Sequence, residues 1–270
     1  MANSINTNYG AQIALQNLNA TNKALETTQN RVNTGLKVSS AKDNGAIFAI
    51  ATSQRADMAA QDAVKNSLQR GQSIVDVALA AGDTITTALE EMKALAVNIQ
   101  SSTGDAQAAY LKDFNALGKE ISDAMTNASF DGVNLWTTAA GTSTAVTTNT
   151  SSGTLQLGSA AATSANAGVT AVTSGSVTAT AATVTAVETA IDAVTDTLGT
   201  LGTQSKSVGR QLTFVSKFQD ALETGIGNLV DADLAKESAK LTALQTKQQL
   251  GVQALSIANS SSSVLLSLFR

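Results

Sequence analysis

Apolar side chains recur at alternating steps of three and four residues along four stretches of the chain. Residues 64–99 keep this heptad spacing except at Gly71 and Gly82, and residues 187–229 keep it at almost every position. Such spacing is typical of long α-helices that pack along an apolar seam. Residues 64–99 also carry a second apolar row, which predicts that this helix contacts more than one neighbour.

The two terminal stretches carry narrower seams. Near the N-terminus the seam consists of Leu15, Leu18, Leu25, Val32 and Leu36. Near the C-terminus, after a phase shift of one residue, it consists of Leu241, Leu244, Leu255, Ala258 and Leu265. Polar residues interrupt both seams at Asn22, Gln29, Glu237 and Gln248. Because such helices gain too little from their own burial to be secure alone, we expect partners to complete them.

A stretch without charged residues, rich in Ser and Thr, runs from Gly132 to Val187. Within it, residues 168–180 combine β-branched residues with a Ser-Gly turn signal, and Thr154–Leu157 has the composition of another short strand. We therefore expect one or two β-hairpins, with low-complexity disorder as the alternative. The whole pattern predicts a mainly α fold: a long antiparallel coiled coil or helical bundle with a small β-hairpin insert.

The residue types that the chain lacks narrow its possible functions. It contains no Pro, Cys or His, and only 3% of its residues are aromatic. Without Pro, four helical tracts can run unbroken. Without His and Cys, the chain can form no imidazole acid–base catalyst, no Cys nucleophile, no disulfide and no zinc site of the usual ligands.

Two short motifs could still carry chemistry. Ser39 and Lys42 have the S-x-x-K spacing of a Ser–Lys acyl enzyme, but the supporting motifs are absent and no apolar pocket favours a neutral amine. Asp231 and Asp233 could touch a hard cation, but neither the Gly nor the Glu of an EF-hand follows. We therefore expect no enzyme activity, no metal and no cofactor, and a chain that works through its surfaces.

Charge and hydropathy exclude two kinds of partner. The net charge is −4 and no Lys/Arg cluster occurs, so we expect no nucleic-acid binding. No apolar run is long enough to insert into a membrane, and the N-terminus has no cleavable signal pattern. These features favour a cytoplasmic location unless export uses an uncleaved signal. A subunit with head-to-tail contacts between its copies would form open helical filaments.

Both ends of the chain resemble bacterial flagellins, in particular the short alphaproteobacterial type. The N-terminal resemblance covers residues 5–51 and includes a core motif at Arg31, Gly35, Leu36, Ser40, Ala41, Lys42 and Asp43. The C-terminal resemblance covers residues 232–270 and includes Ala232, Asp233 and Asn259.

This resemblance implies a structural subunit that polymerises into the flagellar filament for swimming motility. Residues 1–43 with 227–270 would form a terminal coiled-coil domain at the inner filament core, where the two terminal seams would drive polymerisation. Residues 44–226 would form a helical bundle domain with the Ser/Thr-rich hairpin insert 132–187. The terminal arms of flagellins are disordered in the free monomer and fold on polymerisation.

The resemblance also implies a set of partners and a location. The chain would bind copies of itself, the flagellar export apparatus, a chaperone on its C-terminal arm, and the hook-junction and cap proteins. It would be secreted unfolded by the type III route and reside in the extracellular flagellum.

Two surface features are implied in the same way. An animal innate receptor senses flagellins through a motif on the middle helix, and here Glu91 occupies its basic position, with Leu95 four residues later. A reversed charge predicts impaired recognition. O-linked sugars would attach within the region from Thr137 to Thr185, with an unmodified polar loop as the alternative.

Two other functions remain open at this point. A hook–filament junction protein would have a related sequence but would cap a few positions. A secreted adhesin or interaction module would bind cells without forming filaments.

Overall fold

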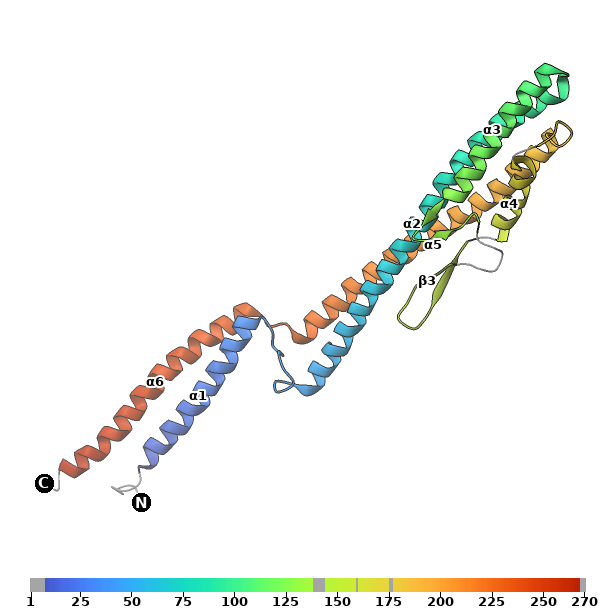
Figure 1. Cartoon of the computed structure of the whole chain (residues 1–270). Helices are drawn as coiled ribbons and strands as arrows, with labels where there is room; N and C mark the ends of the chain where they lie inside the picture. Colours follow the sequence, from blue (N-terminus) through green and yellow to red (C-terminus); the bar gives the residue numbers. More distant parts are fainter. Residues whose placement is uncertain (1–7, 138–143, 159, 175–176, 268–270) are drawn as a thin grey trace. The chain divides into compact units, whose positions relative to one another are not determined.

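The computed structural model describes residues 8–137, 144–158, 160–174 and 177–267, which form mainly helices (Figure 1). The helices are α1 (Tyr9–Thr34), α2 (Gly45–Ser101), α3 (Asp105–Asn127), α4 (Ala160–Thr173), α5 (Val184–Val230) and α6 (Leu234–Ser267). The strands are β1 (Ser129–Phe130), β2 (Val133–Asn134), β3 (Thr144–Thr147) and β4 (Thr154–Leu157). The mainly α fold with a small β insert is confirmed.

The chain divides into two units, and the long helices α2 and α5 each contribute to both. Unit 1 comprises residues 1–56 and 221–270, and unit 2 comprises residues 57–220. Unit 1 contains the antiparallel pair of α1 and α6, which lie side by side (Figure 1). Unit 2 contains α3, α4, the strands and most of α2 and α5.

Helices α2 and α5 run antiparallel through unit 2. Three polar contacts link them at successive levels: Asp62 with Gln219 at 2.7 Å, Gln72 with Ser205 at 2.8 Å, and Lys93 with Glu188 at 2.9 Å. The apolar seam predicted on each helix is buried: Leu68 and Ile85 of α2 and Leu201 and Val208 of α5 are examples. Both long helical predictions are therefore confirmed.

The two glycines in the α2 seam lie where other elements approach the helix closely. A Cβ on Gly82 would lie 2.8 Å from Cζ2 of Trp136, which is fully buried. A Cβ on Gly71 would lie 2.6 Å from a methyl carbon of Val146 on β3. The interruptions in the seam are thus the sites where the indole ring and the β3–β4 hairpin pack against α2.

The insert is more helical than its composition indicates. Thr154–Leu157 is strand β4 and pairs antiparallel with β3, as the sequence predicts. The second hairpin, expected over residues 168–180, is wrong because α4 occupies this region as far as Thr173. Its buried residues recur at helical spacing, Ala162, Ala165, Val169 and Val172. Residues 138–143, 159 and 175–176 of the insert lie outside the described residues.

A fifth long helical element, α3, was not among the four predicted tracts. It buries Phe114, Gly118, Ile121 and Met125 on one face. Its apolar residues are too few for a clear heptad count, but their three- and four-residue spacing is the signal that identifies the helix. The second apolar row predicted on α2 lies beside α3: Ala88 of this row and Leu117 of α3 line one groove.

Candidate functional site

The paired helices α1 and α6 of unit 1 carry most of the residues that the sequence singles out. Seam residues Leu18, Leu25 and Val32 of α1 are half-buried, as are Leu241, Leu244, Leu255 and Ala258 of α6. The helices pack closely at Gly251, where an added Cβ would lie 3.3 Å from Cδ1 of Leu18. Leu15 instead is 48% exposed, Leu36 follows the end of α1, and the side chain of Leu265 lies outside the described part.

Polar side chains cross between the two helices at three levels. The Asn8 amide donates to the Ala258 carbonyl at 2.7 Å, while its Oδ1 accepts from the Ala11 N–H and caps α1. The Gln248 amide donates to Asn22 Oδ1 at 2.9 Å. The polar interruptions of the two seams are therefore partly matched to each other, which defines one antiparallel register.

The third crossing is an ion pair between the last turn of α1 and the first turn of α6. Arg31 Nη1 lies 3.2 Å from Glu237 Oε1, and the two side chains are 26% and 13% exposed. Lys240 contributes a second cation 3.9 Å from the other carboxylate oxygen. Thr28, one turn before Arg31, is fully buried, so water is largely excluded from this part of the pair. Charge-assisted hydrogen bonds in such surroundings are stronger than neutral ones.

The segment between α1 and α2 is ordered by the core motif. Gly35 ends α1 with φ of 72°, a left-handed conformation that other residues adopt at a cost, and its N–H bonds to the Arg31 carbonyl at 2.9 Å. Leu36 then forms a β-bridge with Asp231, and Ala232 N–H donates to the Gly35 carbonyl at 2.8 Å. The motif thereby joins the chain between α1 and α2 to the chain between α5 and α6.

Asp43 organises the second half of this segment. Its Oδ2 accepts hydrogen bonds from the N–H and hydroxyl groups of both Ser39 and Ser40, at 3.0 to 3.1 Å. These bonds, led by that from the Ser39 hydroxyl, hold the pKa of Asp43 below its ordinary value of 3.8. Lys42 is exposed and Ser39 is bonded to Asp43, so the S-x-x-K spacing belongs to a structured turn.

Two helix caps complete the segment. Asn44 Oδ1 accepts from the N–H groups of Ala46 and Ile47 and starts α2, while Asp233 Oδ1 accepts from Lys236 N–H and starts α6. Sequence reasoning missed the caps at Asn8 and Asn44, although an Asn before an apolar-periodic run is a recognised start signal. Asn259, the last motif residue, is exposed on α6.

The outer faces of unit 1 carry an unusual number of exposed large apolar side chains. These are Tyr9, Ile13 and Leu15 on α1, Ile50 on α2, and Leu234, Leu250, Val252 and Ile257 on α6. Ile257 is 69% exposed and Leu250 is 58% exposed, seven residues apart on one side of the helix. Large apolar side chains that share one exposed side of a helix are typical of protein–protein contact surfaces.

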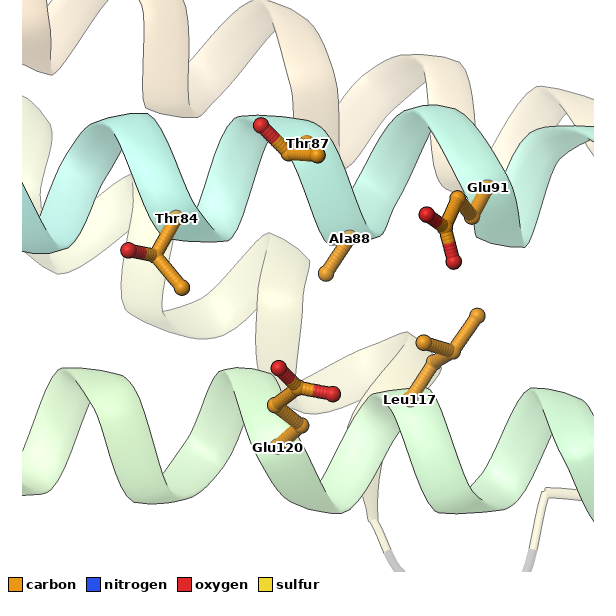
Figure 2. Close-up of a pocket in the computed structure, with 6 residues that line it drawn as sticks. All are labelled: Thr84, Thr87, Ala88, Glu91, Leu117 and Glu120. Atoms are coloured by element: carbon orange, nitrogen blue, oxygen red, sulfur yellow. The ribbon is translucent and has the colours of Figure 1, made fainter.

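The groove between α2 and α3 lies in unit 2. It has a volume of about 260 Å³ and is lined by Thr84, Thr87, Ala88, Glu91, Leu117 and Glu120. Figure 2 shows Glu91 and Glu120 extending from the two helices toward the space between them. Leu95, one turn after Glu91, is half-buried. The groove therefore combines an apolar floor with two carboxylates.

The described ranges contain no group of three or more acidic side chains placed to hold a metal ion. In the same part of the chain, every helix is too short or too polar to cross a bilayer.

Comparisons with known proteins cover almost the whole chain. Residues 5–144 match the bacterial flagellin N-terminal helical region, and residues 184–269 match the bacterial flagellin C-terminal helical region. The chain is 54% identical over 273 residues to flagellin FljK of Caulobacter vibrioides, with 99% of each chain covered. It is also 38% identical over 279 residues to a flagellin of Brucella melitensis, again with 99% of each chain covered.

Proposed function

The chain belongs to the bacterial flagellin family, and from this premise we propose that the paired helices α1 and α6 form the inner core of the filament. The chain itself is a structural subunit of the flagellar filament, the extracellular polymer that serves motility. These findings support the filament subunit over a hook–filament junction protein or an adhesin module.

The exposed apolar residues on the outer faces of unit 1 carry this proposal. Residues such as Leu250 and Ile257 point away from the α1–α6 contact, because the half-buried residues Leu244, Leu255 and Ala258 occupy the other side of α6. Burying one large aliphatic side chain contributes about 1.5 to 3 kcal/mol. The same contacts would repeat in every subunit of a filament, which supports neighbouring copies as their partners.

The proposed role of each seam residue depends on whether it is half-buried between α1 and α6 or exposed. Leu18, Leu25, Val32, Leu241, Leu244, Leu255 and Ala258 would hold α1 against α6 within one subunit, while Leu15 would contact a neighbouring copy. Leu36 would fasten the α1–α2 segment to the start of α6. Leu265 stays a proposed seam residue at the far end of α6.

We propose the domain division on the same basis. Residues 1–43 with 227–270 would be the coiled-coil domain at the inner core, and residues 44–226 the helical bundle domain with the insert 132–187. The further partners would be the type III export apparatus, a chaperone on the C-terminal arm, and the hook-junction and cap proteins.

Two surface proposals concern unit 2 and the insert. Glu91 is exposed, so its negative charge would meet a receptor that expects a basic residue, and recognition would be impaired. Exposed hydroxyls at Thr150, Ser151 and Thr154 in and beside the β3–β4 turn make this turn accessible for O-linked sugars.

The test is an Ile257→Asp variant, with Ser256→Asp as its matched control. Both positions are exposed on α6, but only Ile257 is apolar and belongs to the outer face that polymerisation would bury. We expect Ile257→Asp to prevent filament formation in electron microscopy, and Ser256→Asp to form filaments. Circular dichroism should show the same helix content for unpolymerised Ile257→Asp as for the unpolymerised parent chain. Normal filaments from Ile257→Asp would contradict the proposal.

A further inference from the structure

We infer that unit 2 carries two surfaces that bind each other between neighbouring copies of the chain. One is the α5 aromatic face, formed by Arg210, Phe214, Lys217 and Phe218. The other is the α2–α3 groove described above. The inference rests on the proposed function because it requires a polymer, but its residues lie outside the α1–α6 pair.

The α5 aromatic face carries two rings that are partly exposed. Phe214 is 59% exposed and Phe218 is 39% exposed, and their rings stack with centroids 6.0 Å apart and planes inclined by 10°. Spacing of three, four and seven residues places Arg210 and Lys217 on the same side of α5. Between Thr197 and Gln219 the charged residues are Arg210, Lys217 and Lys206, so this whole stretch of α5 is basic.

The α2–α3 groove has the opposite charge. Glu91 and Glu120 extend toward it from two different helices (Figure 2), and the described residues that line it include no Lys or Arg. The nearby Lys93 is already bound to Glu188 at 2.9 Å. Two carboxylates beside one apolar hollow would favour a partner that brings cationic side chains. Ala88 and Leu117 supply the apolar floor.

The two surfaces complement each other in charge and in polarity. Phe214 and Phe218 can cover the apolar floor of the groove while Arg210 and Lys217 reach its two carboxylates. Aromatic and Arg side chains are the residue types that most often anchor protein–protein contacts. Opposite charges around such an anchor favour the correct partner and the correct register.

One copy cannot bring its own two surfaces together. Gln219 of α5 contacts Asp62, whereas the groove is centred on Ala88, which lies roughly 40 Å further along α2 at 1.5 Å per residue. The occupant of the groove must therefore be the α5 aromatic face of a second copy. Contact between two different patches is heterologous, and such contacts propagate into open helical polymers.

The absence of Cys from the chain allows a direct test by disulfide trapping. Thr87→Cys places a thiol in the groove, and Thr213→Cys places one beside Phe214; both threonines are exposed. The two variants are mixed, polymerised and oxidised, and the products are separated by non-reducing electrophoresis and identified by peptide mass spectrometry. We expect a disulfide between residues 87 and 213 of different copies. Ser122→Cys, exposed elsewhere on α3, should form no such link with Thr213→Cys.

The trapping experiment separates this inference from the proposed function. Filaments that form normally without an 87–213 disulfide would overturn the inference and leave the role of α1 and α6 intact. Equal trapping by the Ser122→Cys control would overturn it as well, because the link would then reflect chance collisions.

Charge reversal provides a second measurement that needs no Cys variant. Combined Arg210→Glu and Lys217→Glu should raise the critical concentration for polymerisation at least tenfold, with unchanged helix content by circular dichroism. Adding Glu91→Lys and Glu120→Lys to the same chain should restore most of the loss. Lys112→Glu, at an exposed position outside both surfaces, serves as the control and should change little. A four-site variant no better than the two-site variant would overturn the inference.

Discussion

The contact between Gly82 and Trp136 makes a sharp test of how α2 packs in unit 2. In Gly82→Ala, the new methyl group would lie 2.8 Å from Cζ2 of Trp136 and 3.1 Å from Cγ of Leu198, and would also meet Leu198 Cδ2. The indole ring cannot move away freely, because its Nε1–H donates to the Ala78 carbonyl at 2.8 Å. Leu198 and the helix backbones must absorb the overlap.

The expected change in stability is the difference between two opposing effects. Overpacking of this kind costs about 1 to 3 kcal/mol. Replacing Gly by Ala within a helix contributes about 0.5 to 1 kcal/mol in the other direction. Gly199→Ala on α5 provides the matched control, because nothing lies within 4 Å of a Cβ built there. The helix contribution is common to both variants, so their difference isolates the steric cost.

Urea unfolding of the full chain, followed by fluorescence, measures this difference. Trp136 is the only tryptophan and is fully buried, so its emission reports on unit 2 alone. We expect Gly199→Ala to be more stable than the parent chain, and Gly82→Ala to be about 1 to 3 kcal/mol less stable than Gly199→Ala. Adding Leu198→Val to Gly82→Ala should recover part of the loss. Equal stability of the two alanine variants would refute the close packing of Trp136 on α2.

Three further predictions concern the α1–α6 region and the insert. Because the pKa of Asp43 is lowered in the folded state, its contribution to stability should be complete above the ordinary value of 3.8 and be lost as pH falls through the lowered value. Filament melting measured from pH 6 to pH 2 should show this loss of stability, and Asp43→Asn should abolish it. Glu237→Gln keeps the shape of the side chain but removes the charge that pairs with Arg31, so filaments should melt earlier by an amount equivalent to about 1 to 2 kcal/mol per subunit, measured by circular dichroism. Intact-mass spectrometry of native filaments should give masses above that of the unmodified 27.4 kDa chain if the insert carries sugars, and the unmodified mass would contradict that proposal.

The fold was predictable wherever one apolar repeat continued over many turns. Helices α2 and α5 were identified because their heptads continue over many turns with few interruptions. The phase shift after Leu229 coincides with the end of α5 at Val230 and the start of α6 at Leu234. Helix α4 was mistaken for a hairpin because β-branched composition was weighed above spacing. In α4 the buried face of Ala and Val outweighs the weak strand preference of Val and Thr, which depends strongly on context.

The assembly surfaces were only partly predictable for a related reason. A heptad count identifies residues on one side of a helix, but it does not say whether that side meets a helix of the same subunit or of another. Leu15 and Leu18 belong to one counted seam, yet Leu15 is exposed and Leu18 contacts α6. The α5 aromatic face escaped the count because Phe214 and Phe218 lie off the seam that meets α2.

The polar residues within the terminal seams have a different meaning once their partners are known. In the sequence, Asn22, Glu237 and Gln248 interrupt the apolar repeat and so weaken each helix taken alone. In the structure Gln248 bonds to Asn22, and Glu237 bonds to Arg31. A shift of α1 along α6 by one heptad would separate Asn22 from Gln248 and would leave Arg31 and Glu237 partly buried without each other, at about 1 to 3 kcal/mol for each of these two unsatisfied groups. Apolar contacts between Leu and Ala tolerate such a shift far better, because they are not directional. The pairs therefore select one register of the terminal helices, and a single register is what identical subunits need to present the same outer apolar face at every position in a filament.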